Sequence, residues 1–258
     1  ESRGLGDVYK RQVQPTWQYR LRSVSVKEIT GMMRNKDEML ILGLTGGIGC
    51  GKTAVLTILK EEYDAYIIEA DRLAHELMEP GKTVYQGIVD AFGMEVLMDT
   101  DIDISAPAEG NAVTDNGQST VNRSIDRKKL GDIVFHDKDK LTLLNSISHP
   151  LVKEEILRRI EEQKDAGKKL FVIEAALLIQ DGYKSICDKM CYVYADLDVR
   201  ISRLCEYRGF TKERAQAVID SQESEAFYLE ACDYKIDNSG SLENTKKDLK
   251  HILDECRI

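Results

Sequence analysis

A glycine-rich run constrains this chain more than any other feature. Residues Gly46 to Thr53 read GGIGCGKT and match the pattern G-x-x-x-x-G-K-[ST], directly after a predicted strand, Met39–Leu44, and at the start of a predicted helix, Lys52–Glu62. Glycine reaches positive φ values, so backbone N–H groups can turn towards an anion at the positive end of the helix. The alternative is a glycine-rich turn without a ligand, which the register of strand, loop and helix disfavours. The run therefore predicts a phosphate-binding loop.

Two side chains at the end of this loop suit a nucleoside triphosphate. Lys52 can reach the β and γ phosphates, and the Thr53 hydroxyl is a hard oxygen ligand for Mg²⁺. The pattern carries no information about a second substrate.

Short apolar runs alternate with amphipathic segments from Met39 onward, which favours a parallel sheet covered by helices on both faces. The predicted strands are Met39–Leu44, Ala65–Glu69, Leu170–Ala175, Met190–Ala195 and Tyr234–Asp237. The predicted helices are Lys52–Glu62, Asp71–Met78, Thr83–Phe92, Asp126–Phe135, Pro150–Gln163, Val199–Tyr207, Lys212–Ser221 and Leu242–Cys256. Pro150 is expected at the first position of its helix, where a missing N–H costs nothing.

Composition excludes several classes of function. A formal net charge of −9 argues against general binding to nucleic acid or to an anionic membrane. No apolar run reaches the ~18 residues of a transmembrane helix. The 6 cysteines form no C-x-x-C pair, and none lies at metal-ligand spacing from a histidine. We therefore expect free thiols and a cytoplasmic protein, without a disulfide framework or a zinc site.

Three segments interrupt the alternation of strands and helices. Residues 1–31 contain SRGLGDVYKRQ, which resembles a translated frame of a transposase sequencing adapter, so we expect a non-native leader. Residues 99–124 are polar and are expected to form an exposed loop or a disordered insertion. Residues 126–168 contain three helical segments and no strand, which predicts an inserted helical subdomain. The expected domain is 32–258, with its core at 39–95 and 169–258.

Asp71 follows the second predicted strand and begins a helix, so it lies at the carboxyl end of the sheet, where ligands of open α/β sheets bind. Its carboxylate could accept a proton from an attacking hydroxyl or help to hold Mg²⁺. A helix N-cap is an equally good interpretation, because aspartate caps helices well.

Basic side chains gather around a turn at Gly209; they are Arg203, Arg208, Lys212 and Arg214. Guanidinium groups on a mobile helical flap suit the clamping of phosphates during transfer. A solvated helix face is an equally good interpretation of the charge pattern.

Cys50 lies inside the loop, beside Lys52 and a helix N-terminus. Both neighbours favour a thiolate, which predicts a lowered pKa and rapid alkylation that MgATP blocks. The alternative is an inert thiol that packs inside the loop.

The segment from Gly43 to Thr53, GLTGGIGCGKT, closely resembles the opening of dephospho-coenzyme A kinases, where the Cys50 position is usually serine. The resemblance covers the chain from Met39 onward. It continues in order through Glu69-Ala70-Asp71, Glu79-Pro80-Gly81, His149-Pro150-Leu151-Val152, Arg203 to Thr211, Ser221-Gln222 and Asp233 to Gly240.

This resemblance implies an α/β P-loop kinase fold: a five-stranded parallel sheet flanked by helices, with an inserted helical substrate subdomain and a lid near residues 203–222. It implies transfer of the ATP γ-phosphoryl group, with Mg²⁺, to the 3′-hydroxyl of dephospho-coenzyme A, which is the last step of coenzyme A synthesis. The implied catalytic residues are Lys52, Asp71 as the base, Arg203 and Arg208. The implied nucleotide-binding residues are Gly47, Ile48, Gly49, Cys50, Gly51, Lys52, Thr53, Ala54 and Asn238, with Thr53 on the metal.

Some positions depart from the family pattern. The family segment D-x-P-L-L-x-E reads here from Glu174 to Gln180, with Ala176 in place of proline and Gln180 in place of glutamate. Tyr207 and Val218 stand where many members carry arginine. Two alternatives remain: another small-molecule P-loop kinase, acting on a nucleoside or a sugar acid, and a nucleotide-dependent regulatory module. A monomer or small homo-oligomer is expected, without nucleic-acid or membrane partners.

Overall fold

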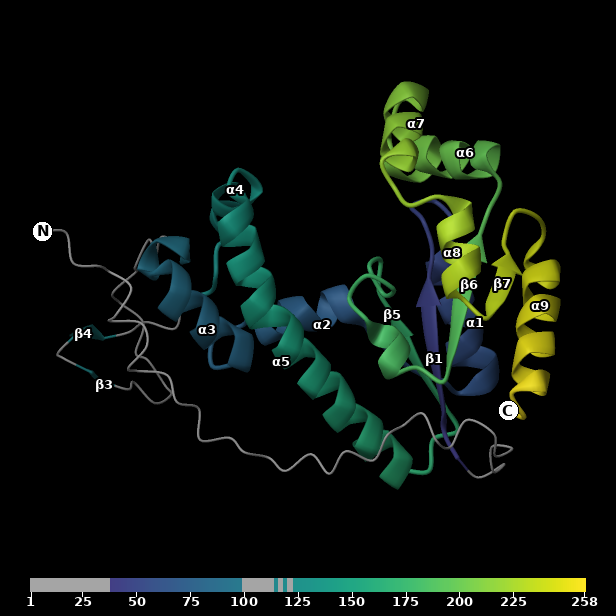
Figure 1. Ribbon diagram of the computed structural model, residues 1–258, viewed down its shortest axis with the longest axis horizontal. Helices are drawn as coiled ribbons and strands as arrows, with labels where there is room; N and C mark the ends of the chain where they lie inside the picture. Colours follow the sequence, from purple (N-terminus) through teal and green to yellow (C-terminus); the bar gives the residue numbers. More distant parts are fainter. Residues whose placement is uncertain (1–37, 99–113, 116–117, 120–122) are drawn as a thin grey trace, which may run out of the picture. The chain divides into compact units, whose positions relative to one another are not determined.

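Five parallel strands form a sheet in the order β2-β5-β1-β6-β7 (Figure 1). The strands are β1 (Leu40–Thr45), β2 (Tyr66–Glu69), β5 (Leu170–Glu174), β6 (Lys189–Tyr194) and β7 (Tyr234–Asp237). Every residue of β1 and β5 is buried, because helices cover both faces of the sheet. The predicted five-stranded parallel sheet is therefore confirmed, and each strand begins and ends within one residue of its predicted bounds.

The computed structural model describes residues 38–98, 114–115, 118–119 and 123–258. The predicted leader at 1–31 lies outside these residues, as does most of the predicted insertion at 99–124. Within that insertion, β3 (Thr114–Asp115) pairs antiparallel with β4 (Gln118–Ser119).

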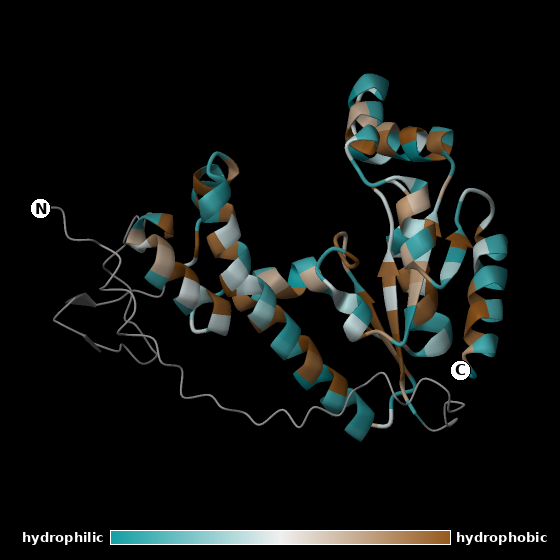
Figure 2. Cartoon of the chain, in the orientation of Figure 1, coloured by the Kyte–Doolittle hydropathy of each residue, from teal (hydrophilic) through white to brown (hydrophobic). Residues whose placement is uncertain are grey.

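Alternate residues of the central strand β1 point their side chains into two hydrophobic cores, one on each face of the sheet. Leu40, Leu42 and Leu44 pack with α1 (Lys52–Tyr63) and α9 (Leu242–Glu255) on one face. Ile41 contributes to the core on the other face, which the other helical layer covers. That layer contains α2 (Ala70–Leu77), α3 (Thr83–Phe92), the 3₁₀ turn η2 (Met94–Val96), α4 (Arg127–Phe135) and α5 (Lys138–Asp165). Figure 2 shows the central strands of the sheet as largely hydrophobic and α9 with alternating hydrophobic and hydrophilic bands.

Residues 126–168 hold two helices where three segments were predicted. Asp126 caps α4 and Asp137 caps α5, since each carboxylate accepts two backbone N–H groups. Pro150 lies inside α5, so its expected position at the start of a helix is wrong. An interior proline removes one helical hydrogen bond. The helix nevertheless continues, because Val152, Ile156 and Ile160 bury their side chains in the core.

Two short helices follow β6 on the side of the sheet to which the strand arrows point (Figure 1). Helix α6 (Leu197–Arg208) ends at Gly209 with φ 63°, and α7 (Lys212–Asp220) is capped by Thr211. They share a small core of their own, made of Leu204, Ala215 and Ile219. Helix α8 (Glu225–Ala231) and the 3₁₀ turn η3 (Tyr183–Ser185) are elements that the sequence patterns did not predict.

Among the described residues, no helix combines the length and the apolar character needed to cross a membrane.

Candidate active site

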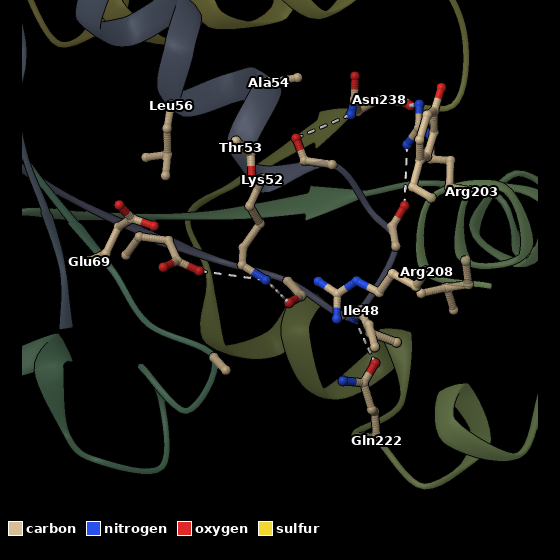
Figure 3. Close-up of a pocket in the computed structure, with 18 of the residues that line it drawn as sticks. Ile48, Lys52, Thr53, Ala54, Leu56, Glu69, Arg203, Arg208, Gln222 and Asn238 are labelled. Carbon is tan, nitrogen blue, oxygen red and sulfur yellow. Dashed lines mark hydrogen bonds and ion pairs between the residues drawn. The ribbon is translucent and has the colours of Figure 1, made fainter. Parts of the chain in front are cut away.

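The glycine-rich loop connects the carboxyl end of the central strand β1 to the first turn of α1, as predicted (Figure 3). Gly51 has φ 85° and ψ 33°, and a Cβ atom there would collide with the side chain of Asn238. Only glycine fits this position without strain. The backbone N–H groups of Gly49 and Gly51 donate to no acceptor within the described part of the chain. The loop therefore retains donors for an anion.

Lys52 leaves the first turn of α1 and points back under the loop (Figure 3). Its Nζ donates to the carbonyl of Gly46 at 2.9 Å and lies 3.6 Å from Oε1 of Glu174. Glu174 is 8% exposed, and burial raises the pKa of its carboxyl group although the Lys52 ammonium acts in the opposite direction. The Gly46 carbonyl and the Glu174 carboxylate thus hold the Lys52 ammonium group beside the loop, where it can reach a bound phosphate.

Three carboxylates meet at the carboxyl ends of β2 and β5. Glu69 and Glu174 are register partners in the two strands, and Asp71 follows two residues after Glu69. Glu69 and Asp71 both raise the pKa of Glu174 further, after the larger effect of burial. This edge of the cavity is acidic and faces the ammonium group of Lys52.

Asp71 is not the N-cap of α2, so that interpretation is wrong. The capping position belongs to Glu69, and Asp71 is the second residue of the helix. Its exposed carboxylate has no hydrogen-bond or ion-pair partner among the residues that the structure describes. The carboxylate is therefore free to interact with a ligand in the cavity that it lines.

Arg203 and Asn238 support the loop from behind (Figure 3). The Arg203 guanidinium donates to the carbonyls of Cys50 at 3.2 Å and of Asn238 at 2.8 Å. The side chain of Asn238 is buried; it donates to the Cys50 carbonyl at 2.8 Å and accepts from the Thr245 hydroxyl at 3.0 Å. Both residues fix the shape of the loop through its carbonyl groups.

Arg208 differs from Arg203 in having no partner among the residues that the structure describes. It is the last residue of α6, is exposed, and forms no ion pair or hydrogen bond with any described residue. Its side chain extends towards the loop (Figure 3). Of the other basic residues that the sequence groups here, Arg214 packs over the ring of Phe210, and neither Lys212 nor Arg214 lines the cavity.

A cavity of about 790 Å³ collects most of the predicted site residues. The predicted residues that line it are Gly47, Ile48, Gly49, Gly51, Lys52, Thr53, Ala54, Asp71, Arg203, Arg208 and Asn238. Two of the positions that depart from the family pattern also line it, Ala176 and Tyr207, and the Tyr207 side chain is 75% exposed.

Cys50 does not behave as the sequence suggested. Its side chain is 2% exposed, and burial raises the pKa of the thiol although Lys52, Arg200 and Arg203 act to lower it. The predicted lowering of the pKa is wrong, because desolvation of the charged form outweighs the nearby cations. A thiol that packs inside the loop fits this burial.

Sequence reasoning missed two residues that contact the loop directly. Arg200 donates from Nε to the Ile48 carbonyl at 2.8 Å, and the Ile48 N–H donates to Oε1 of Gln222 at 2.8 Å. Arg200 lies three residues before Arg203, the first member of the basic group around Gly209, and Gln222 ends one of the motifs of the family resemblance. Neither pattern shows that the two side chains converge on one loop residue.

Loops of this geometry at the end of a central parallel strand bind nucleotide phosphates. The cavity beside the loop has room for a phosphoryl acceptor next to the Asp71 carboxylate. Fold and site together define a P-loop kinase. The model of the dephospho-CoA kinase family matches residues 40–103 and 112–244. The chain belongs to this family.

Curated relatives agree with this assignment over most of their length. The dephospho-CoA kinase of Carboxydothermus hydrogenoformans is 37% identical over 217 residues, which cover 84% of this chain and 94% of the relative. The dephospho-CoA kinase of Corynebacterium glutamicum is 35% identical over 217 residues, covering 84% of this chain and 100% of the relative.

Solved structures share the fold. TT1252 from Thermus thermophilus superposes with a TM-score of 0.63 at 24% identity, covering 84% of this chain and 98% of that chain. The dephospho-CoA kinase from Campylobacter jejuni superposes with a TM-score of 0.55 at 24% identity, covering 84% and 96% respectively.

Proposed function

We propose that this protein transfers the γ-phosphoryl group of ATP to the 3′-hydroxyl of dephospho-coenzyme A, which yields coenzyme A and ADP. One observation carries the proposal: Lys52, Thr53 and the free carboxylate of Asp71 line the same cavity at the carboxyl edge of the sheet. Membership of the dephospho-CoA kinase family supplies the identity of the acceptor.

The glycine-rich loop is the proposed ATP site. Phosphate oxygens would accept from the N–H groups of Gly49 and Gly51 at the N-terminus of α1, which have no acceptor in the described part of the chain. Lys52 would move from Glu174 to the β and γ phosphates.

The site also fits Mg²⁺. The Thr53 side chain is exposed in the cavity, and its hydroxyl donates to no described protein acceptor. The described residues hold no cluster of three or more His, Cys, Asp or Glu side chains that could bind a metal. This suits Mg²⁺, which usually has one or two protein ligands and otherwise binds phosphates and water. When bound, Mg²⁺ would neutralise charge on the phosphates.

Asp71 is the proposed proton acceptor. The 3′-oxygen of the acceptor forms a bond to the γ-phosphorus while the bond from that phosphorus to the β–γ bridging oxygen breaks, and the hydroxyl proton passes to the Asp71 carboxylate. An exposed and unpaired carboxylate can take this proton without first breaking a protein hydrogen bond. Catalysis would come mainly from positioning and from electrostatic stabilisation.

The two arginines of α6 have different proposed roles. Arg208 is free to pair with the transferring phosphoryl group, whereas Arg203 already donates to loop carbonyls and would hold the loop in shape. We infer that α6 and α7 form the lid and that the helical subdomain at 126–168 contributes to the acceptor site.

A direct assay tests the proposal. The purified chain is incubated with MgATP and dephospho-coenzyme A, and both ADP release and coenzyme A formation are followed. Coenzyme A itself is the matched control, because its 3′-oxygen already carries phosphate. We expect dephospho-coenzyme A to exceed nucleosides, nucleotides and sugar acids by at least about a hundredfold in kcat/KM. Comparable rates with a nucleoside or a sugar acid would instead indicate another small-molecule kinase. Failure of every acceptor, with nucleotide-dependent binding of a partner protein, would indicate a regulatory module.

We further infer a cytoplasmic enzyme that acts as a monomer or small homo-oligomer. All 6 cysteines are free thiols in the structure, which suits a reducing compartment.

A further inference from the structure

One residue of the phosphate loop, Ile48, is held through both of its backbone groups by two side chains from the α6–α7 region. The Ile48 N–H donates to Oε1 of Gln222 at 2.8 Å, and the Ile48 carbonyl accepts from Nε of Arg200 at 2.8 Å. The triangle is closed by a third bond, since Nη2 of Arg200 donates to the same Oε1 of Gln222 at 2.9 Å. Both backbone groups of Ile48 are therefore satisfied from outside the loop.

The close approach depends on Gly47. A Cβ atom on this residue would lie 2.5 Å from Nη2 of Arg200 and 2.8 Å from Oε1 of Gln222. A side chain at position 47 would therefore displace Arg200 and Gln222 from their present positions. The glycine is what allows the two side chains to approach the loop this closely.

The bond to Gln222 removes the Ile48 N–H from the set of loop donors that are available to a ligand. The N–H of Ile48 already has a protein acceptor, whereas those of Gly49 and Gly51 have none among the described residues. With the peptide units before and after Ile48 each held by one of these bonds, the rest of the loop has a defined orientation before ATP binds. Preorganised donors bind an anion more tightly than donors that must first be ordered.

We propose that Gln222 is a positioning residue for nucleotide binding, which acts through the backbone N–H of Ile48 and links the lid to the phosphate loop. The proposal rests on the proposed function in taking ATP as the phosphoryl donor and α6 and α7 as the lid. Gln222 stands two residues after the end of α7, and Arg200 belongs to α6. Residues at the start of α6 and just after α7 are therefore both hydrogen-bonded to Ile48. A movement of the lid would change these bonds and so the position of the loop.

Glu223, which follows Gln222, connects this turn to the segment after β5. Glu223 accepts a hydrogen bond from Nε2 of Gln180 at 3.4 Å, in the segment after β5. The glutamate that the family carries at position 180 would place two carboxylates together here, so Gln180 suits its partner.

Three single variants test the role of Gln222. Gln222→Leu keeps the approximate size but removes the acceptor, and Gln222→Glu keeps an acceptor oxygen for Ile48 and Arg200. Gln216→Leu is the matched control, because Gln216 is a glutamine of α7 whose amide bonds to Asp220, away from the loop. The dissociation constant of ATP is measured by calorimetry, and amide hydrogen exchange is followed at Ile48 and in β1.

Gln222→Leu is expected to weaken ATP binding about tenfold or more, because a donor of the loop and a donor of Arg200 lose their acceptor. Exchange at Ile48 should accelerate while exchange in β1 stays unchanged. Gln222→Glu should keep exchange at Ile48 at the wild-type rate, since its acceptor is retained. Its ATP affinity does not report on the loop alone, because the added carboxylate lines the same cavity as the loop and repels a triphosphate. Gln216→Leu should match the wild type in both measurements.

Two results would overturn the proposal: ATP affinity of Gln222→Leu within twofold of the wild type, or equal acceleration of exchange at Ile48 in Gln222→Leu and Gln222→Glu. Gln222 is only partly buried in a turn, so folding should survive. If Gln222→Leu does not fold, Arg200→Lys decides, because a single ammonium cannot reproduce the two-sided contact with Ile48 and Gln222; unchanged ATP affinity in that variant would equally reject the proposal. ATP binding requires no acceptor, so failure of the dephospho-coenzyme A assay leaves this outcome separate.

Discussion

At the scale of single residues, the position of the Lys52 ammonium group predicts a large effect on the rate of phosphoryl transfer. It lies between the Gly46 carbonyl and the Glu174 carboxylate. Lys52→Ala should lower kcat by ~10²–10³, because one positioned donor on a transferring phosphoryl group contributes about this factor. Single-turnover kinetics measure the loss. The control is Lys60→Ala, an exposed lysine of the same helix. Retention of more than about a tenth of the activity would contradict the assigned role.

Asp71 makes a second prediction at this scale. Asp71→Asn should lower turnover by ~10²–10⁴ while ATP affinity changes little, because the amide cannot accept the hydroxyl proton. The thermal midpoint should not change, since Asp71 does not cap α2. Steady-state kinetics and calorimetry separate these effects, with Asp254→Asn on the surface of α9 as the control. Near-normal turnover would exclude Asp71 as the base.

At the scale of elements, the proline inside α5 leads to a prediction about stability. Pro150 is exposed inside the helix and leaves the carbonyl of Ser146 without its helical donor. Pro150→Ala should therefore raise the free energy of unfolding by about 1 kcal/mol or more. Urea unfolding measures the change. Pro80→Ala provides the control, because Pro80 lies in a turn outside any helix and should give no gain. A destabilised Pro150→Ala variant would show that the proline is accommodated by a bend that the packing needs.

At the scale of the whole molecule, we expect an ion-pair network centred on α5 to contribute to the stability of the fold in acid. Glu155 of α5 pairs with Arg158 and Arg159, and Arg159 also reaches Glu76 of α2. Hydrogen bonding from Arg158 in particular lowers the pKa of Glu155 to about 2. A carboxyl group whose pKa is depressed on folding stabilises the protein above its unfolded pKa of about 4.3, and this stabilisation disappears as the pH falls towards 2.

Glu155→Gln should accordingly lower the free energy of unfolding by about 1 kcal/mol at pH 7, after allowance for solvent screening. The difference from the wild type should shrink between about pH 4 and pH 2 and then vanish. Denaturant titrations across this range measure it. Glu161→Gln, in a more exposed pair with Lys164, should change little at any pH. A difference that does not depend on pH would refute the electrostatic origin.

Most of the fold follows from local patterns in the sequence. The central strands β1 and β5 are almost entirely apolar because both faces of the sheet are covered, and apolar runs of this kind made the strand bounds predictable to one residue. Helix α8 was missed because it is short and buries fully only Tyr228. The start of α5 was misplaced because a proline rule for isolated helices was applied where packing of Ile156 and Ile160 overrides it.

The candidate site divides in a similar way. The loop residues are predictable because one contiguous pattern specifies a strand, a turn and a helix. The contacts of Arg200 and Gln222 with Ile48 were not predictable, since they join residues far apart in the sequence. Cys50 was misjudged because its neighbours in sequence are cationic, whereas its pKa is set by burial that only the fold determines.

The place of β1 in the sheet has a consequence for the synthesis of the protein on the ribosome. Although β1 is the first strand of the sheet to emerge, its two neighbours are β5 and β6, and Leu40 pairs with Leu170. The nascent strand therefore remains unpaired and apolar until more than half of the chain has been translated. An mRNA truncated before β5 would yield a product that cannot assemble the nucleotide site and that exposes β1 to chaperones or to aggregation.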